Sequence, residues 1–127
     1  MSTKLLLDKK RHIIIKILPI YWAFLTYILL RKNSGIALDY WFIFPGIDKV
    51  VHFATFTVLG FLLKLSFPKM KTLFFVYIIL IYAFLTEILQ DQMKLGRSLE
   101  TWDIIADFAG AMLGFVLCRI LVVRRLN

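Results

Sequence analysis

The hydrophobic positions of the chain are gathered into four nearly uninterrupted blocks, separated by short polar stretches. The blocks cover about residues 13–30, 50–67, 72–89 and 104–123. A helix of roughly 18 to 20 residues spans about 27–30 Å, which is close to the hydrocarbon thickness of a bilayer. Because a segment inside a membrane must satisfy its own backbone hydrogen bonds, the pattern predicts four transmembrane helices.

Composition agrees with an all-α, polytopic membrane protein built as a bundle of four helices. Of the 127 residues, 61% are hydrophobic, whereas a soluble domain has about 45–50%. No linker or repeat divides the chain, so we expect one domain over residues 1–127. The first block is interpreted as a retained span, because no small-x-small cleavage site precedes Arg31.

The charged residues predict how the bundle is oriented. We call the side with both termini and the Pro68 turn the basic side, and the opposite one the acidic side. The basic side carries Lys4, Lys9, Lys10, Arg11, Lys64, Lys69, Lys71, Arg119, Arg124 and Arg125, with the single acid Asp8. The acidic side has seven of the eight acidic residues. The positive-inside rule therefore places both termini in the cytoplasm of a bacterial cell, with the chain in its inner membrane.

The net charge of +8 does not indicate nucleic-acid binding, because the basic residues flank apolar blocks as they do in membrane proteins. The single cysteine, Cys118, excludes an internal disulfide and a thiolate metal cluster.

Polar residues gather where the second and third blocks meet the acidic side. Asp48 and His52 are four residues apart and so share a helical face. Lys49 follows Asp48 directly. Asp48 can also cap this helix, but a cap does not explain His52, which lies one turn deeper. Glu87 and Gln90 lie on one face at the end of the third block. A carboxylate at the depth of Glu87 is expected to face a polar partner or cavity, unless it reaches up to the membrane interface.

An acidic and glycine-containing stripe runs along the fourth block. Its members follow one another at spacings of three or four residues and are Arg97, Glu100, Asp103, Asp107, Gly110 and Gly114. Glycines at this spacing let a neighbouring helix approach closely. Asp107 is then expected to face that neighbour rather than lipid. Asp103 can also be interpreted as a carboxylate that favours the dipole at the helix N-terminus.

Together these groups predict a polar pocket that opens on the acidic side. Its candidate residues are Asp48, Lys49, His52, Glu87, Gln90, Arg97, Glu100, Asp103 and Asp107, with Gly110 and Gly114 as helix-packing positions. Oxygen donors with one imidazole suit a divalent cation such as Mg²⁺, Mn²⁺ or Zn²⁺. The candidate metal ligands are His52, Glu87, Asp103 and Asp107.

These motifs resemble the VanZ-like family of membrane proteins. Asp48-Lys49-Val50-Val51-His52-Phe53 resembles the family's D-K-x-x-H-F element. Glu87 and Gln90, followed by Gly96-Arg97-Ser98, Asp103 and the two glycines, resemble its second element. The resemblance covers about residues 48–115 and departs from the family pattern at Asp107, where Asn is usual. The resemblance makes glycopeptide tolerance one expected role, although most family members are found outside resistance clusters, and it assigns no catalytic residue.

The sequence leaves three functions open. The leading hypothesis is a binding module for a lipid-linked or amphiphilic envelope molecule, including a lipid-linked precursor or a glycopeptide, because Lys49 and Arg97 suit phosphate or carboxylate. The alternative is a membrane enzyme that uses a metal ion or acid–base chemistry on an envelope lipid. The third is a small ion- or proton-coupled transporter, since carboxylates inside membranes often relay protons.

Overall fold

The computed structural model describes the backbone of residues 3–30, 47–92 and 101–123, and the side chains of residues 9–30, 49–92 and 101–122. These residues form helices and contain no strand. The four long helices are α1 (Thr3–Leu30), α2 (Ile47–Ser66), α3 (Thr72–Gln92) and α4 (Thr101–Cys118), and a π-helical turn, η1 (Arg119–Val123), continues α4. All four are long and apolar enough to cross a membrane. The all-α class and the four spans are therefore confirmed.

The helix boundaries differ from the apolar blocks in two places. Helix α1 begins at Thr3 rather than near Ile13, because Lys and Arg are good helix formers and extend the helix beyond its apolar part. The last block was predicted as one α-helix over 104–123, but α4 runs from Thr101 to Cys118 and the block's final five residues form the π-helical η1. Nothing in the sequence predicts this change of hydrogen-bond pattern.

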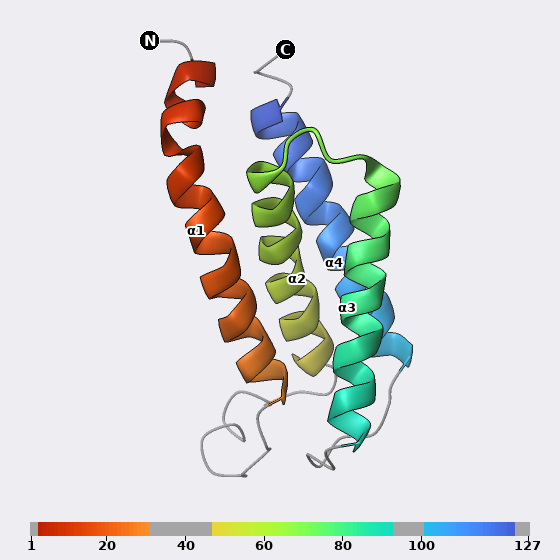
Figure 1. The fold of residues 1–127 in the computed structure, drawn as a ribbon. Helices are drawn as coiled ribbons and strands as arrows, with labels where there is room; N and C mark the ends of the chain where they lie inside the picture. Colours follow the sequence, from red (N-terminus) through yellow and green to blue (C-terminus); the bar gives the residue numbers. More distant parts are fainter. Residues whose placement is uncertain (1–2, 31–46, 93–100, 124–127) are drawn as a thin grey trace.

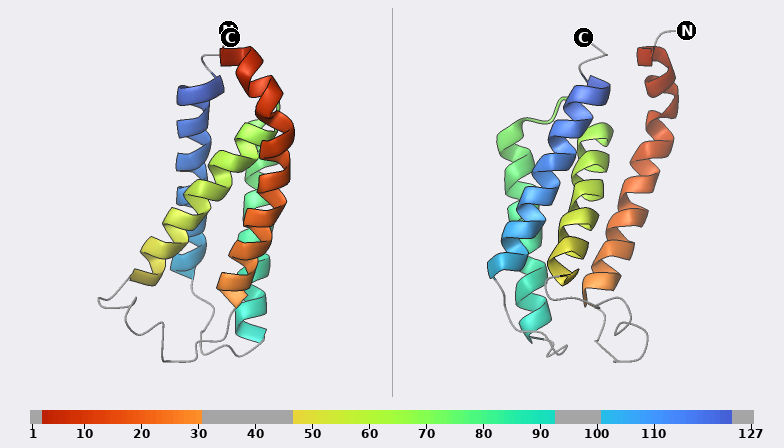
Figure 2. Two further views of the ribbon diagram at one scale, coloured as in Figure 1. Left: turned by 90° about the vertical axis from the view of Figure 1, so that its left-hand side faces the viewer. Right: turned by 180° about the vertical axis from the view of Figure 1, so that it is seen from behind.

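Helices α2 and α4 form the most extensive contact of the bundle. Helix α4 also packs against α3, and α1 packs against α2 and α3 from the other side. Figure 1 shows α1 beside α2, with α4 behind α2 and α3. The views in Figure 2 show the same arrangement from the side and from behind. Helix α4 thus links α2 to α3.

The core of this bundle is mainly apolar. It includes Leu25, Phe56, Leu59, Phe75 and Ile79, all at most 1% exposed. The outward faces also carry many apolar side chains, and Ile20, Leu73, Ile81 and Trp102 are among the most exposed of them. An apolar surface of this extent is unfavourable in water, so the bundle is suited to a lipid bilayer.

A glycine stripe brings α4 against the backbone of α2. A Cβ atom added to Gly110 would collide with the carbonyl of Phe53, and one added to Gly114 would collide with the backbone of Thr57 and Phe61. The approach is reciprocal, because a Cβ on Gly60 of α2 would collide with the carbonyl of Ala111. Only glycine permits two helices to pack this closely at these three positions.

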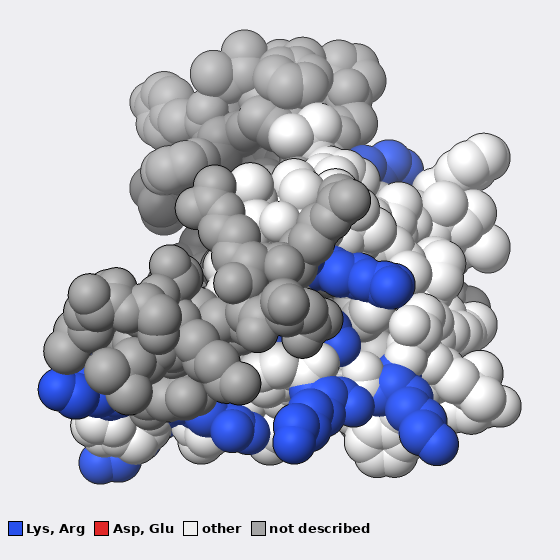
Figure 3. Space-filling view, turned by 90° about the horizontal axis from the view of Figure 1, so that it is seen from above, with Lys and Arg blue, Asp and Glu red and all other residues white. Residues whose placement is uncertain are grey.

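The beginning of α1, the turn between α2 and α3, and the end of α4 lie at one end of the bundle (Figure 1). Seen from this end, the described surface displays Lys and Arg and no Asp or Glu (Figure 3). Its exposed cations include Lys9, Lys10, Arg11, Lys69, Lys71 and Arg119. The basic side is therefore one face of the structure, and the described acids lie toward the other end.

Lys64, at the end of α2, stabilises the turn between α2 and α3 by donating hydrogen bonds to its carbonyl groups. Its side chain is buried, and its Nζ donates to the carbonyls of Pro68 at 2.8 Å and Met70 at 3.0 Å. The ammonium also lies 5.0 Å from the ring centroid of Phe115, a cation–π distance. The turn itself is tight, since the Met70 N–H donates to the Phe67 carbonyl at 3.0 Å.

Candidate functional site

Polar side chains from three helices are buried together near the acidic side. His52 comes from α2, Glu87 from α3 and Asp107 from α4, and their exposed fractions are 2%, 1% and 0%. We call these three residues the polar cluster. Each lies within the two helical turns of its helix that are nearest the acidic side. Burying ionisable side chains at this depth costs free energy unless they pair with one another or bind a ligand.

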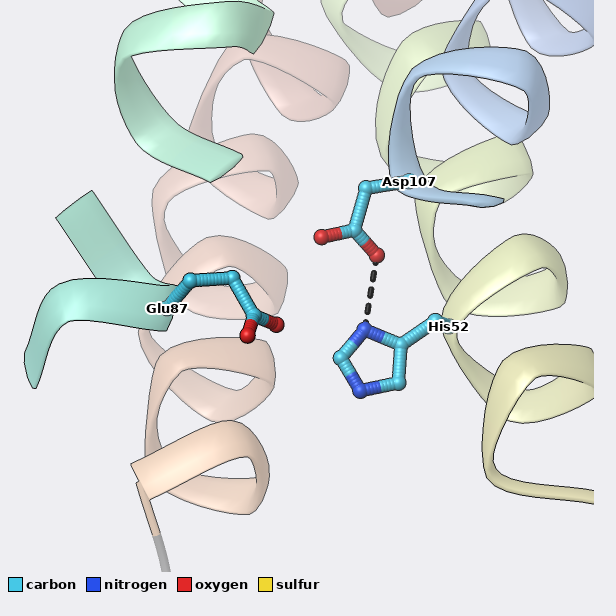
Figure 4. Close-up of side chains that lie close together, drawn as sticks. All are labelled: His52, Glu87 and Asp107. Carbon is cyan, nitrogen blue, oxygen red and sulfur yellow. Dashed lines mark hydrogen bonds and ion pairs between the residues drawn. The ribbon is translucent and has the colours of Figure 1, made fainter. Parts of the chain in front are cut away.

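The centre of the polar cluster is a hydrogen bond between His52 and Asp107. Nδ1 of His52 lies 2.7 Å from Oδ1 of Asp107 (Figure 4). The contact depends on the packing of α2 against α4, because Asp107 precedes Gly110 by three residues and so lies on the same face, one turn away. The glycine stripe therefore positions the pair as well as the two helices.

Glu87 approaches this pair from the opposite helix. Figure 4 shows its carboxylate pointing from α3 toward the imidazole ring of His52 and the carboxylate of Asp107. One ligand atom from each of the three residues can be chosen so that all lie within 4.8 Å of one another. Two further polar atoms of the cluster, Nε2 of His52 and Oδ2 of Asp107, have no hydrogen-bond partner among the described residues.

Lys49 and Asp103 lie between the polar cluster and the acidic side. Lys49 Nζ is 3.4 Å from Asp103 Oδ1, and the two side chains are 35% and 8% exposed. Asp103 Oδ2 is 4.0 Å from His52 Nε2, which is too long for a hydrogen bond. Lys49 and Asp103 thus form an ion pair, in which Lys49 is partly exposed and Asp103 lies near the buried imidazole of His52.

Gln90 does not lie in this cluster, although the sequence grouped it with Glu87. Its Nε2 donates to the Leu29 carbonyl at 2.5 Å. Leu29 belongs to the last turn of α1, where carbonyl groups have no partner within the helix. Gln90 therefore ties α3 to the end of α1. The side chain of Asp48 and all of Arg97 and Glu100 lie outside the described residues.

Helix α1 contributes polar contacts that the sequence did not predict. Tyr21 donates its hydroxyl to the Thr55 carbonyl at 2.7 Å, and the hydroxyls of Thr26 and Tyr82 lie 2.6 Å apart. These residues sit among ordinary apolar positions, and hydroxyl side chains are common in membrane helices. No sequence signal distinguishes them from other interfacial positions, so only the packing of the helices identifies them.

The charges of the described residues around the polar cluster do not cancel. Glu87, Asp103 and Asp107 provide three carboxylates, against the single ammonium of Lys49. A protonated His52 would reduce the excess by one but not remove it. Buried charge of one sign must be balanced by protons, by further positive groups of the chain or by a ligand. Histidine and carboxylate side chains are also the groups that bind cations and exchange protons.

The fold and this arrangement define a multi-pass membrane protein with a buried His–carboxylate cluster near one face of the bundle. The model of the VanZ/LLP1 family matches residues 5–122, so the chain belongs to that family. The match confirms the family resemblance carried by the motifs around His52 and Glu87. No curated protein and no solved structure matches the chain.

Proposed function

We propose that the chain binds the polar headgroup of a lipid-linked or amphiphilic envelope molecule at its acidic side. The observation that carries the proposal is a row of three polar side chains whose exposure decreases toward the bundle interior. The side chain of Lys49 is 35% exposed, that of Asp103 is 8% exposed, and His52 is buried. We call these three residues the graded series. An ammonium at the end of such a series can recognise a phosphate or carboxylate group. The polar groups beneath it give the headgroup further donors and acceptors.

The surroundings of Lys49 suit the apolar part of the same ligand. Val50 and Phe53, on α2 next to Lys49, are 55% and 37% exposed. Trp102, in the first turn of α4, is 69% exposed, which is typical of an aromatic side chain at a membrane interface. An amphiphile could therefore keep its chain in the bilayer while its headgroup reaches Lys49.

The proposed location is the bacterial inner membrane, with the acidic side outside and both termini in the cytoplasm. The basis is the distribution of Lys and Arg, which marks the basic side as the cytoplasmic one. We expect a membrane-impermeant thiol reagent to leave Lys71→Cys unlabelled in intact cells and to label it in inverted vesicles. The native Cys118 is buried and gives a low background. Labelling of Lys71→Cys in intact cells would overturn this orientation.

Ligand binding is tested by purifying the protein gently from cell envelopes and measuring bound amphiphile by native mass spectrometry. We expect Lys49→Gln to lower its occupancy about tenfold or more, because a hydrogen bond to a charged group is worth about 1.5–3 kcal/mol. The matched control is Lys71→Gln, an exposed lysine of the basic side. Equal occupancy in the wild-type protein and in Lys49→Gln would contradict the proposal.

A second candidate function is acid–base catalysis on the same molecule. It is favoured by the 2.7 Å contact of His52 with Asp107, since a carboxylate that orients an imidazole is a common arrangement for a general base. The same mass spectrometry distinguishes the two functions. A product that forms with the wild-type protein and not with His52→Ala would indicate an enzyme, and an unchanged amphiphile would indicate binding alone. A role in glycopeptide tolerance would require expression of the chain to lower glycopeptide susceptibility.

A further inference from the structure

The geometry points to a divalent transition-metal ion, Zn²⁺ or Mn²⁺, held by His52, Glu87 and Asp107. Because it uses the same cluster, this ion site rests on the proposed function and adds a cofactor to it. The three residues come from three different helices and are at most 2% exposed. Their ligand atoms lie within 4.8 Å of one another.

The distances are close to those of a bound ion. Ligands held at about 2.1 Å in a tetrahedral site lie about 3.4 Å apart. In this structure the ligand atoms of the three residues lie within 4.8 Å of one another. Small rotations of the carboxylate groups would bring the longer of these distances toward about 3.4 Å. Glu87 has three rotatable bonds and already points at the other two residues (Figure 4). Rotation about these bonds changes the distance between the Glu87 carboxylate and the other two ligands.

The ion takes the place of the proton between His52 Nδ1 and Asp107 Oδ1, which are 2.7 Å apart. The imidazole then keeps its hydrogen on Nε2, and this nitrogen faces Asp103 Oδ2 at 4.0 Å. A histidine that binds a metal ion usually donates its other N–H to a carboxylate, which fixes the ring. Asp103 would take this role once the distance shortened to that of a hydrogen bond, and its other carboxylate oxygen is paired with Lys49.

An independent observation is that Asp107 is fully buried while its Oδ2 has no hydrogen-bond partner among the described residues. A buried carboxylate oxygen of this kind is costly. Figure 4 shows the carboxylate directed into the space between Glu87 and His52. An ion in that space would satisfy the oxygen, which no described side chain does.

The chemistry of the three side chains supports the same assignment. His52 offers an imidazole, which binds metal ions in its neutral form, and Glu87 and Asp107 each offer a carboxylate. The mixed set of one nitrogen and two carboxylates favours Zn²⁺ or Mn²⁺ over Mg²⁺ and Ca²⁺, which prefer oxygen ligands alone.

The test measures Zn²⁺ bound to the purified full chain after chelation, dialysis against excess Zn²⁺ and removal of free ion. We expect one Zn²⁺ per chain in the wild-type protein and at least a tenfold loss of affinity in Glu87→Gln and His52→Ala. Asp91→Asn and His12→Ala are the matched controls, because they change an exposed carboxylate of α3 and the only other histidine. Both controls are expected to bind Zn²⁺ as the wild-type protein does.

The thermal unfolding midpoint of each variant is measured as well, because it shows whether a variant that binds no Zn²⁺ is still folded. Zn²⁺ is expected to raise the thermal unfolding midpoint of the wild-type protein by several degrees and to leave that of Glu87→Gln unchanged. No bound Zn²⁺ in a folded wild-type protein, or equal binding by Glu87→Gln and Asp91→Asn, would overturn the ion site. Amphiphile occupancy measured in the presence of chelator is a separate readout. Loss of Zn²⁺ binding with retained amphiphile would contradict the ion site alone, and loss of the amphiphile with retained Zn²⁺ would contradict the proposed function alone.

Discussion

Replacement of Gly114 by alanine is expected to destabilise the bundle, although the same change at an ordinary helix position stabilises it. Alanine is favoured over glycine inside a helix by about 1 kcal/mol. At Gly114 the added methyl group would collide with the backbone of Thr57 and Phe61. Backbone atoms cannot rotate away, so α2 would have to move, and overpacking of this kind costs about 1–3 kcal/mol. Leucine at the same position is expected to prevent stable packing of α4 on α2.

The measurement is the thermal unfolding midpoint of the purified protein in one detergent. Ala109→Leu is the matched control, because Ala109 lies on the same helix and is exposed. We expect this control to unfold near the wild-type temperature. A Gly114→Ala protein that is more stable than the wild type would show that α2 and α4 do not pack as closely as described.

Substitution of a glycine in the stripe should disturb the polar cluster as well as the stability of the bundle. Gly110 is in contact with the Phe53 backbone, and His52 is the residue before Phe53. A displacement of α2 at the glycine stripe therefore also separates His52 from Asp107, which are joined at 2.7 Å. The sequence places the acids and the glycines on one helical face because the same helix–helix contact holds both.

The four helices could be predicted from the sequence because apolar blocks of membrane length leave few alternatives. The block at residues 72–89 agrees with α3, which runs from Thr72 to Gln92. The ends were less predictable. Helix α1 continues through Lys9, Lys10 and Arg11 to Thr3, since a helix ends where its hydrogen bonds end and not where its apolar residues do.

The candidate site could be predicted only as a set of residue types near one membrane face. His52 and Asp107 are 55 positions apart, and their contact depends on how α2 and α4 rotate about their own axes. Helical spacing fixes which residues share a face, but it does not fix which face meets which neighbour. Gln90 illustrates the difference, because it shares a face with Glu87 and yet reaches the Leu29 carbonyl of α1.

Asp107→Ala is expected to have the largest effect among substitutions in the polar cluster. It removes the oxygen that pairs with Nδ1 of His52 at 2.7 Å, and His52 is only 2% exposed. A buried imidazole without its partner cannot turn to water, so we expect a loss of about 3 kcal/mol or more in unfolding free energy. The thermal unfolding midpoint measures the loss. Asp91→Ala, an exposed carboxylate near the end of α3, should change stability by less than about 0.5 kcal/mol.

Asp107→Asn separates the hydrogen bond from the charge. The amide oxygen still accepts from Nδ1 of His52, so stability should stay within about 1 kcal/mol of the wild type. The negative charge is lost, however, and Zn²⁺ affinity should fall by about 10- to 100-fold. Asn is also the usual residue here in the VanZ-like pattern, so the fold should accept it. If Asn and Ala destabilise the protein equally, the hydrogen bond to His52 is not what holds α4 at this position. If Asn leaves Zn²⁺ affinity unchanged, Asp107 is not a ligand and only orients the imidazole.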